Sequence, residues 1–169
     1  IINLDAHLDL RLVGESGPSS GTPFTQIRNL APDRFDYLCL GVAEEANTLA
    51  LFQRAEEWGV EMVSDHALID SPTAGDPAID ALVARSDLIY LTIDLDLLPA
   101  YQCPGVSAPA ARGVSFHIVE RMINQVLNNC ERHNCQIPLS DIVELSPPHD
   151  RDGISARAAA LLTRQLLCH

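Results

Sequence analysis

The sequence predicts an α/β fold with three layers, α/β/α, built around a mainly parallel β-sheet. Apolar segments of strand length recur along the 169 residues, and segments with helical periodicity separate them. The strand segments are apolar throughout, which is typical of parallel sheets covered by helices on both faces. In such sheets, ligands bind beyond the carboxyl ends of the strands.

Five strands and four helices are expected. The strands correspond to apolar runs at residues 2–4, 37–42, 60–63, 88–93 and 142–145. The helices correspond to residues 48–58, 77–85, 116–130 and 155–167. Gly59 ends the first helix, and Ser115 is placed as the N-cap of the third. Three long loops, 10–24, 97–113 and 147–153, follow strand ends, where loops usually form the site.

Composition argues against several classes of partner. The formal net charge is −12, from 11 basic and 23 acidic residues, which disfavours nucleic acid and anionic membrane surfaces. No apolar run approaches the roughly 18 residues of a membrane-spanning helix. The five cysteines are odd in number and scattered, which is typical of a reduced cytoplasmic protein rather than of a disulfide framework.

Two clusters of acidic residues follow apolar strands. Asp5, His7 and Asp9 come directly after the first strand, and alternate side chains of an extended segment share one face. Asp94 and Asp96 follow the run 88–93 in the same way. One such triplet could equally be a polar strand end with a capping aspartate. Two clusters at one sheet edge favour a metal site, because unpaired buried carboxylates are strongly disfavoured.

The chemistry of the two clusters indicates which metals they would hold. Hard carboxylate oxygens with one imidazole suit Mn, Fe(II), Co or Zn better than a thiolate site would. Four aspartates and one histidine can hold two divalent metals that share a water. The sequence therefore predicts a metal site at the carboxyl edge of the sheet.

Taken in order along the chain, these motifs resemble the ureohydrolase family. Asp-Ala-His-Leu-Asp at 5–9 and Asp-Leu-Asp at 94–96 are followed by Pro104-Gly105 and by Asp-Ile-Val-Glu at 141–144. The family includes arginase, agmatinase and formimidoylglutamase, which are dinuclear manganese hydrolases of C–N bonds. Segments 7–11, 19–23 and 104–113 look most like the formimidoylglutamase branch. The resemblance implies an arginase-like fold, two Mn²⁺ ions and a small-molecule substrate.

The resemblance also implies a role for each member of the two clusters. Asp5 and Asp94 would bridge the two metals. Asp9 would complete the ligand shell of one metal and hydrogen-bond the attacking hydroxide. His7 and Asp96 would bind the other metal. Metal ligands are thus expected at Asp5, His7, Asp9, Asp94 and Asp96, with Asp9 also acting in catalysis.

Four further residues are expected to contact the substrate. By resemblance, Glu144 would face the cationic nitrogens of an amidine or formimino group and act in catalysis. Arg11 lies two residues beyond Asp9, in phase with the ligands, and a bidentate arginine favours a substrate carboxylate. The Ser19 and Ser20 hydroxyls could bind the same carboxylates. Formimino-glutamate carries two carboxylates and agmatine carries none, although Arg11 could equally be a surface residue paired to an acid.

Three departures from the family pattern affect these predictions. The family's first metal ligand, a histidine in an upstream Gly-Gly-x-His segment, has no counterpart here. We therefore expect residues 1–169 to be the C-terminal portion of a single ureohydrolase domain. Ser19-Ser20-Gly21 stands where arginase and agmatinase carry a catalytic histidine, which favours the formimino branch. Leu98-Pro99 replaces an Asp-Pro that commonly follows the second cluster.

The favoured hypothesis is hydrolysis of N-formimino-L-glutamate to glutamate and formamide, in histidine degradation. Another amidinohydrolase activity, of the guanidino acid, agmatinase or arginase type, remains an alternative. A catalytically dead metal-binding fragment is the alternative from a different class, and this fragment alone is not expected to be active. A homo-oligomer is compatible with these predictions, and the sequence does not decide the oligomeric state.

Overall fold

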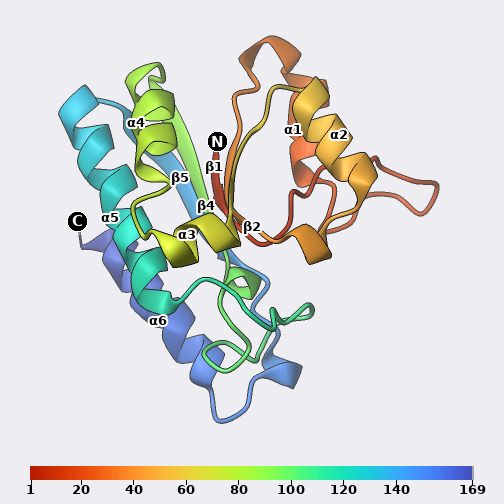
Figure 1. Ribbon diagram of the computed structural model, residues 1–169, viewed down its shortest axis with the longest axis vertical. Coiled ribbons are helices and arrows are strands. Elements are labelled where there is room, and N and C mark those ends of the chain that lie inside the picture. Colours follow the sequence, from red (N-terminus) through yellow and green to blue (C-terminus); the bar gives the residue numbers. More distant parts are fainter. Residues whose placement is uncertain (169) are drawn as a thin grey trace.

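A computed structural model describes residues 1–168 and contains a five-stranded parallel sheet (Figure 1). The strands are β1 (Ile2–Leu4), β2 (Leu38–Val42), β3 (Glu61–Ser64), β4 (Leu88–Asp94) and β5 (Gln136–Val143). Their order in the sheet is β3-β2-β1-β4-β5, and each neighbouring pair is parallel. The predicted parallel α/β sheet is therefore confirmed.

Six α-helices surround the sheet within the described residues. They are α1 (Pro23–Leu30), α2 (Leu49–Glu57), α3 (Asp65–Asp70), α4 (Asp76–Ala84), α5 (Phe116–His133) and α6 (Ile154–Leu167). Short 3₁₀ turns lie at Pro32–Arg34, Glu44–Ala46, Leu95–Leu97 and Pro147–His149. No helix in residues 1–168 is long and apolar enough to cross a membrane.

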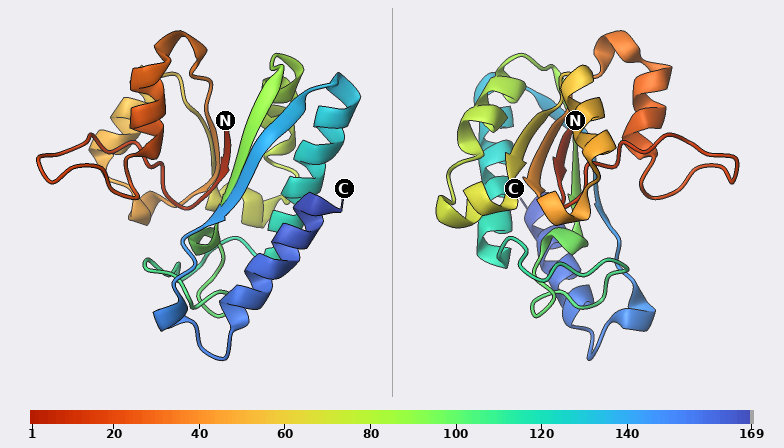
Figure 2. Two further views of the ribbon diagram at one scale, coloured as in Figure 1. Left: turned by 180° about the vertical axis from the view of Figure 1, so that it is seen from behind. Right: turned by 45° about the vertical axis from the view of Figure 1, so that its right-hand side comes forward.

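The helices cover the sheet on both faces (Figure 2). Neighbouring residues of β2 point to opposite faces, so that Leu38 and Leu40 enter one core and Cys39 enters the other. The larger core packs the sheet against α3, α4, α5 and α6. Its helical members include Leu68, Ile79, Leu82, Val119, Met122, Ile123 and Leu162. The smaller core packs β2 against α1 and α2, through Phe24, Tyr37, Leu51 and Ala55.

Three elements differ from the sequence-based expectations. Helix α1 begins at Pro23, inside the segment expected to be irregular, and α3 is only six residues long. Helix α3 begins after Ser64, whose hydroxyl accepts a hydrogen bond from the Ala67 N–H. Strand β5 begins at Gln136, six residues before the expected start. Its early residues are polar or exposed, because β5 is an edge strand held by backbone pairing with β4.

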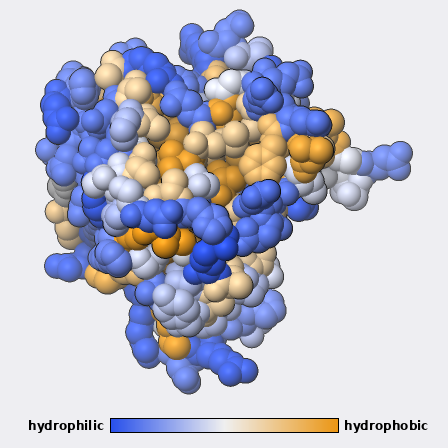
Figure 3. Space-filling model, viewed as in Figure 1, coloured by the Kyte–Doolittle hydropathy of each residue, from blue (hydrophilic) through white to orange (hydrophobic). Residues whose placement is uncertain are grey.

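The opposite edge of the sheet, at β3, carries an exposed apolar surface. Figure 3 shows apolar side chains gathered between the two layers of helices on this face. Phe52, Met62 and Val63 line a hollow of about 610 Å³ there, and Met62 is 39% exposed. None of the residues that line this hollow belongs to the two acidic clusters.

Candidate active site

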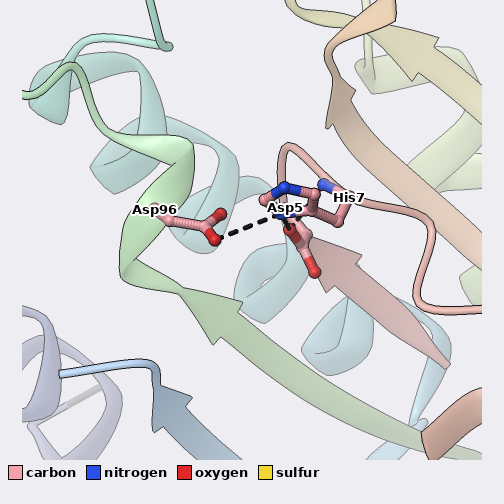
Figure 4. A group of neighbouring side chains, drawn as sticks. All are labelled: Asp5, His7 and Asp96. Atoms are coloured by element: carbon pink, nitrogen blue, oxygen red, sulfur yellow. Dashed lines mark hydrogen bonds and ion pairs between the residues drawn. The ribbon is translucent and has the colours of Figure 1, made fainter. Parts of the chain in front are cut away.

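Strand pairing brings the two acidic clusters together. Strands β1 and β4 are neighbours, with Leu4 opposite Ile93, so Asp5 and Asp94 are the next residues along the two strands. Asp5 and His7 lie in the loop after β1, and Asp96 lies in the turn after β4; the three side chains point toward one another (Figure 4). One ligand atom from each of these three lies within 4.8 Å of the others. The convergence therefore follows from the register of two parallel strands.

His7 is in contact with two buried carboxylates. Its Nδ1 lies 3.1 Å from Asp96 Oδ2 and 3.4 Å from Asp5 Oδ1. Hydrogen bonds to Asp5 and Asp96 raise the pKa of His7 to about 11. A protonated imidazole in this position offsets part of the negative charge of the cluster. Because a metal ligand must be the neutral imidazole, metal binding here would release a proton from His7.

The pKa values of Asp5, Asp9 and Asp94 are also raised. Burial raises the pKa of Asp5, and the charge of Asp96 raises it further. Burial and the charges of nearby acids raise the pKa of Asp94 to about 10 and that of Asp9 to about 8. Within residues 1–168, Oδ1 of Asp96 is buried and has no hydrogen-bond partner. Such a concentration of buried acids is costly unless a cation offsets it, so the donor set fits divalent metal ions.

Both strand-end aspartates also shape the backbone that follows them. Oδ1 of Asp5 accepts a hydrogen bond of 2.6 Å from the His7 N–H. Oδ1 of Asp94 accepts one of 2.8 Å from the Asp96 N–H. Each aspartate therefore caps the turn that follows it, and its carboxylate also belongs to the acidic cluster.

Buried polar residues that the sequence analysis did not identify hold the first cluster in place. Asn3 Nδ2 donates hydrogen bonds to Asp5 Oδ2 at 2.9 Å and to the Tyr37 hydroxyl oxygen at 3.0 Å. The Tyr37 hydroxyl in turn donates to the backbone oxygen of Leu8 at 3.1 Å. The sequence held a signal for Asn3, because it is a polar residue in an apolar strand and shares a face with Asp5.

Asn47 supports the same loop from the other side. Its Oδ1 accepts a hydrogen bond of 3.0 Å from the Leu8 N–H, and its Nδ2 donates to the backbone oxygens of Ala6 and Ala43 at 2.9 Å each. Asn47 follows the 3₁₀ turn after β2, so one amide joins the loops after β1 and β2. No pattern in the sequence distinguishes Asn47 from an ordinary loop asparagine.

A cavity of about 190 Å³ opens over the acidic cluster. It is lined by His7, Asp9, Arg11, Ser20, Gly21, Asp94, Asp96, Ser107, Ala108 and Glu144. The lining comes from the loop after β1, from the end of β4 and the loop after it, and from Glu144, which follows β5. Asp9 and Glu144 both have left-handed backbone conformations, with φ of 49° and 63°. Such conformations are uncommon for residues other than glycine and often occur at functional sites.

Of the residues expected to bind a substrate carboxylate, Arg11 and Ser20 line this cavity and Ser19 does not. Arg11 is exposed at its wall, and its side chain passes over Gly21, where an added Cβ would lie 2.9 Å from Arg11 Cδ. Ser20 also lines the cavity. Ser19 is not among the described residues that line the cavity. Its backbone N–H donates a hydrogen bond of 3.0 Å to Thr22 Oγ1. The roles of Arg11, Ser19 and Ser20 stay predictions.

Glu144 has a partner that the sequence analysis did not identify. The Ser107 hydroxyl donates a hydrogen bond of 3.0 Å to Glu144 Oε2. Ser107 belongs to the loop after β4, and Glu144 directly follows β5. The only sequence signal for Ser107 is its position inside segment 104–113.

A second hollow, of about 370 Å³, adjoins the first and shares His7 and Ala108 with it. Small residues between Ala108 and Gly113 form much of its wall. Arg112 closes one side, with Nε 2.9 Å from Asp65 Oδ2 and Nη2 2.8 Å from Glu45 Oε1. These ion pairs tie the loop after β4 to the segments after β2 and β3.

Comparisons with known proteins agree with this arrangement. The family model described as Arginase family matches residues 1–169. The formimidoylglutamase of Aeromonas hydrophila subsp. hydrophila is 49% identical over 174 residues, which cover 99% of this chain and 52% of that protein. The chain thus spans about half the length of the curated relatives it matches.

Solved structures share the fold. The formimidoylglutamase of Bacillus subtilis aligns with a TM-score of 0.81 at 24% identity, over 99% of this chain and 51% of that one. The formiminoglutamase of Trypanosoma cruzi, solved with Mn²⁺, aligns with a TM-score of 0.79 at 22% identity, over 98% of this chain and 54% of that one. The resemblance seen in the motifs and the match over the whole sequence lead to one conclusion. This chain belongs to the arginase family.

Proposed function

We propose that the protein containing this chain hydrolyses N-formimino-L-glutamate to glutamate and formamide, in the cytoplasm and as part of histidine degradation. The observation that carries the proposal is the 190 Å³ cavity, in which the acidic cluster, Glu144 and Arg11 line one space. The relative from Aeromonas hydrophila, named formimidoylglutamase, supports the choice of substrate.

The metal requirement belongs to the proposal. Two Mn²⁺ ions would be held by Asp5, His7, Asp9, Asp94 and Asp96, and the Mn²⁺ in the Trypanosoma cruzi formiminoglutamase supports this choice of metal. When bound, such ions lower the pKa of a shared water and stabilise negative charge that develops on the substrate. The buried and unpartnered Asp96 Oδ1 is the feature of this chain that best fits a cation.

The residues around the cavity divide the remaining work. Glu144 accepts hydrogen bonds from the formimino N–H groups and fixes the carbon to be attacked. Arg11 and Ser20 bind a glutamate carboxylate at the cavity wall. Asp9 accepts a hydrogen bond from the attacking water. It takes up the proton that the water loses and delivers this proton to the departing nitrogen. The bond from the formimino carbon to the glutamate nitrogen then breaks, and the products are formamide and glutamate.

The activity is tested directly on the complete protein that contains this chain, loaded with Mn²⁺. We expect release of glutamate and formamide from formimino-glutamate, with kcat/KM at least about 100-fold above that for arginine, agmatine or a guanidino acid. Chelation of the metal is expected to abolish turnover. A preference for a guanidino acid would support the other amidinohydrolases, and metal binding without turnover of any substrate would support the non-catalytic alternative.

Replacing Arg11 with alanine is expected to raise KM for formimino-glutamate about 10- to 100-fold, with a smaller change in kcat. The substitution removes a charged hydrogen-bond donor from the substrate carboxylate, in the ground state as well as in the transition state. Steady-state kinetics measure the effect, and Arg34→Ala, at an exposed residue of a 3₁₀ turn, is the matched control. An unchanged KM would identify Arg11 as a surface residue.

A further inference from the structure

We propose that Ser107 is a positioning residue for Glu144, whose carboxylate it holds in the orientation that receives the substrate's cationic nitrogens. The inference rests on the proposed function of Glu144. Ser107 Oγ donates to Glu144 Oε2 at 3.0 Å, between residues 37 positions apart in the sequence. Both residues line the cavity that opens over the acidic cluster.

The loop that carries Ser107 is anchored at Gly105, two residues before it. The Gly105 N–H donates to Ser155 Oγ at 2.7 Å, and the Gly105 carbonyl accepts from the Ser146 N–H at 2.8 Å. A Cβ on Gly105 would lie 2.5 Å from Asp150 Cβ, so the close approach requires glycine. Ser146 is two residues after Glu144, and the anchoring therefore sets the distance between the two loops that share the Ser107–Glu144 bond.

The loop contacts reach a rigid element. Asp150 Oδ1 accepts from the Ser155 N–H at 2.9 Å, and Oδ2 accepts from the Ala156 N–H at 3.0 Å, at the first turn of α6. Ser155 is fully buried there. Ser107 is thus attached, through Gly105, to the beginning of a helix rather than to a free loop. A hydroxyl on such a support can restrict a neighbouring side chain.

The glutamate side chain of Glu144 is flexible, so a fixed orientation of its carboxylate requires a hydrogen-bonding partner. A glutamate side chain has several rotatable bonds and loses rotamer freedom when it is fixed. Glu144 is half-buried at the cavity, so its carboxylate can also turn toward solvent. Without a tether, the side chain gains rotamer freedom and hydration by doing so. A bond from Ser107 opposes that turn.

A serine hydroxyl is well suited to this role. It is neutral, so Glu144 keeps the full negative charge that attracts an amidine-like cation, whereas a lysine or arginine partner would offset that charge. One donor on Oε2 leaves Oε1, and the second lone pair of Oε2, available to substrate N–H groups. Ser107 therefore orients the carboxylate without occupying it.

The test is a set of variants in the complete Mn²⁺-loaded protein that contains this chain. Ser107→Ala is expected to lower kcat/KM about tenfold, the value of a hydrogen bond to a charged group, with metal content and Tm unchanged. Ser107→Thr keeps the hydroxyl and should restore most of the loss. Ser146→Ala is the matched control, because its hydroxyl contacts His149 Nδ1 at 2.8 Å rather than Glu144.

A double-mutant cycle separates positioning from a general structural role. In a Glu144→Ala background, Ser107→Ala should cause no further loss, because the group it positions is gone. Additive losses would overturn the proposal. So would an unaffected Ser107→Ala variant, or a Ser107→Thr variant as impaired as the alanine variant.

The positioning role of Ser107 can be tested even if the proposed reaction does not occur. If the wild-type protein does not turn over formimino-glutamate, the same double-mutant cycle is run with the affinity for the formamidinium ion as its readout. NMR titration measures that affinity. A weaker affinity in Ser107→Ala, with no further change in the Glu144→Ala background, would uphold the positioning role while the proposed reaction fails. If formamidinium does not bind the wild-type protein, the role of Ser107 is overturned together with that of Glu144.

Discussion

Replacing Asp96 with alanine is expected to abolish turnover, with a fall of at least about 10³-fold, and to release metal from the protein. Asp96 Oδ2 lies 3.1 Å from His7 Nδ1, and its Oδ1 is buried without a partner among residues 1–168. The substitution leaves His7 without one of its two carboxylate neighbours. A lost ligand reduces the metal's stabilisation of charge in the transition state, which is worth several kcal/mol.

Metal analysis of the purified protein and the shift of Tm on adding Mn²⁺ measure this effect. A metal that binds only the folded state raises Tm, so the shift should shrink or vanish in Asp96→Ala. Asp70→Ala, at the exposed end of α3, is the control and should keep both metal and shift. Full metal content in Asp96→Ala would contradict the assignment of Asp96 as a ligand.

Replacing Glu144 with glutamine is expected to reduce kcat/KM about 10²- to 10³-fold while the metal content stays the same. Glutamine is nearly isosteric and its carbonyl can still accept the hydrogen bond from Ser107, which is 3.0 Å long in the native protein. It cannot offset the positive charge of the substrate, however, and preorganised charges aimed at the reacting group contribute on this scale.

The pair of measurements distinguishes Glu144 from the metal ligands. Loss of metal in Glu144→Gln would show that Glu144 belongs to the metal shell, and near-normal rates would show that another acid faces the substrate. Glu57→Gln, at the exposed end of α2, is the matched control for the change of charge. Inductively coupled plasma analysis and steady-state kinetics on the same preparations provide both readings.

The sequence alone was sufficient to predict a parallel sheet and to identify the acids that follow two of its strands. Buried parallel strands need apolar residues on both faces, and this requirement marks the runs before Asp5 and Asp94 directly. The acids stand out because each interrupts an apolar run at the strand end. The predicted strands at 2–4 and 88–93 agree with β1 and β4 to within one residue.

Elements with little apolar periodicity were missed for a physical reason. Helix α3 has six residues, too few for a repeating apolar face, and forms after the Ser64 cap. Most of β5 is polar or exposed, because an edge strand is held by backbone hydrogen bonds to β4 that any side chain permits. Helix α1 follows a segment rich in glycine, proline and serine and begins with Pro23.

Only the tertiary structure decided which residues support the candidate site. Asp5 and Asp94 are 89 positions apart, and they meet because β1 and β4 are neighbours in a sheet whose strand order differs from the sequence order. Asn47 reaches the first cluster, and Ser107 reaches Glu144, through hydrogen bonds between separate loops. A hydrogen bond of about 3 Å depends on how whole elements pack, and no local pattern of residue types encodes that distance.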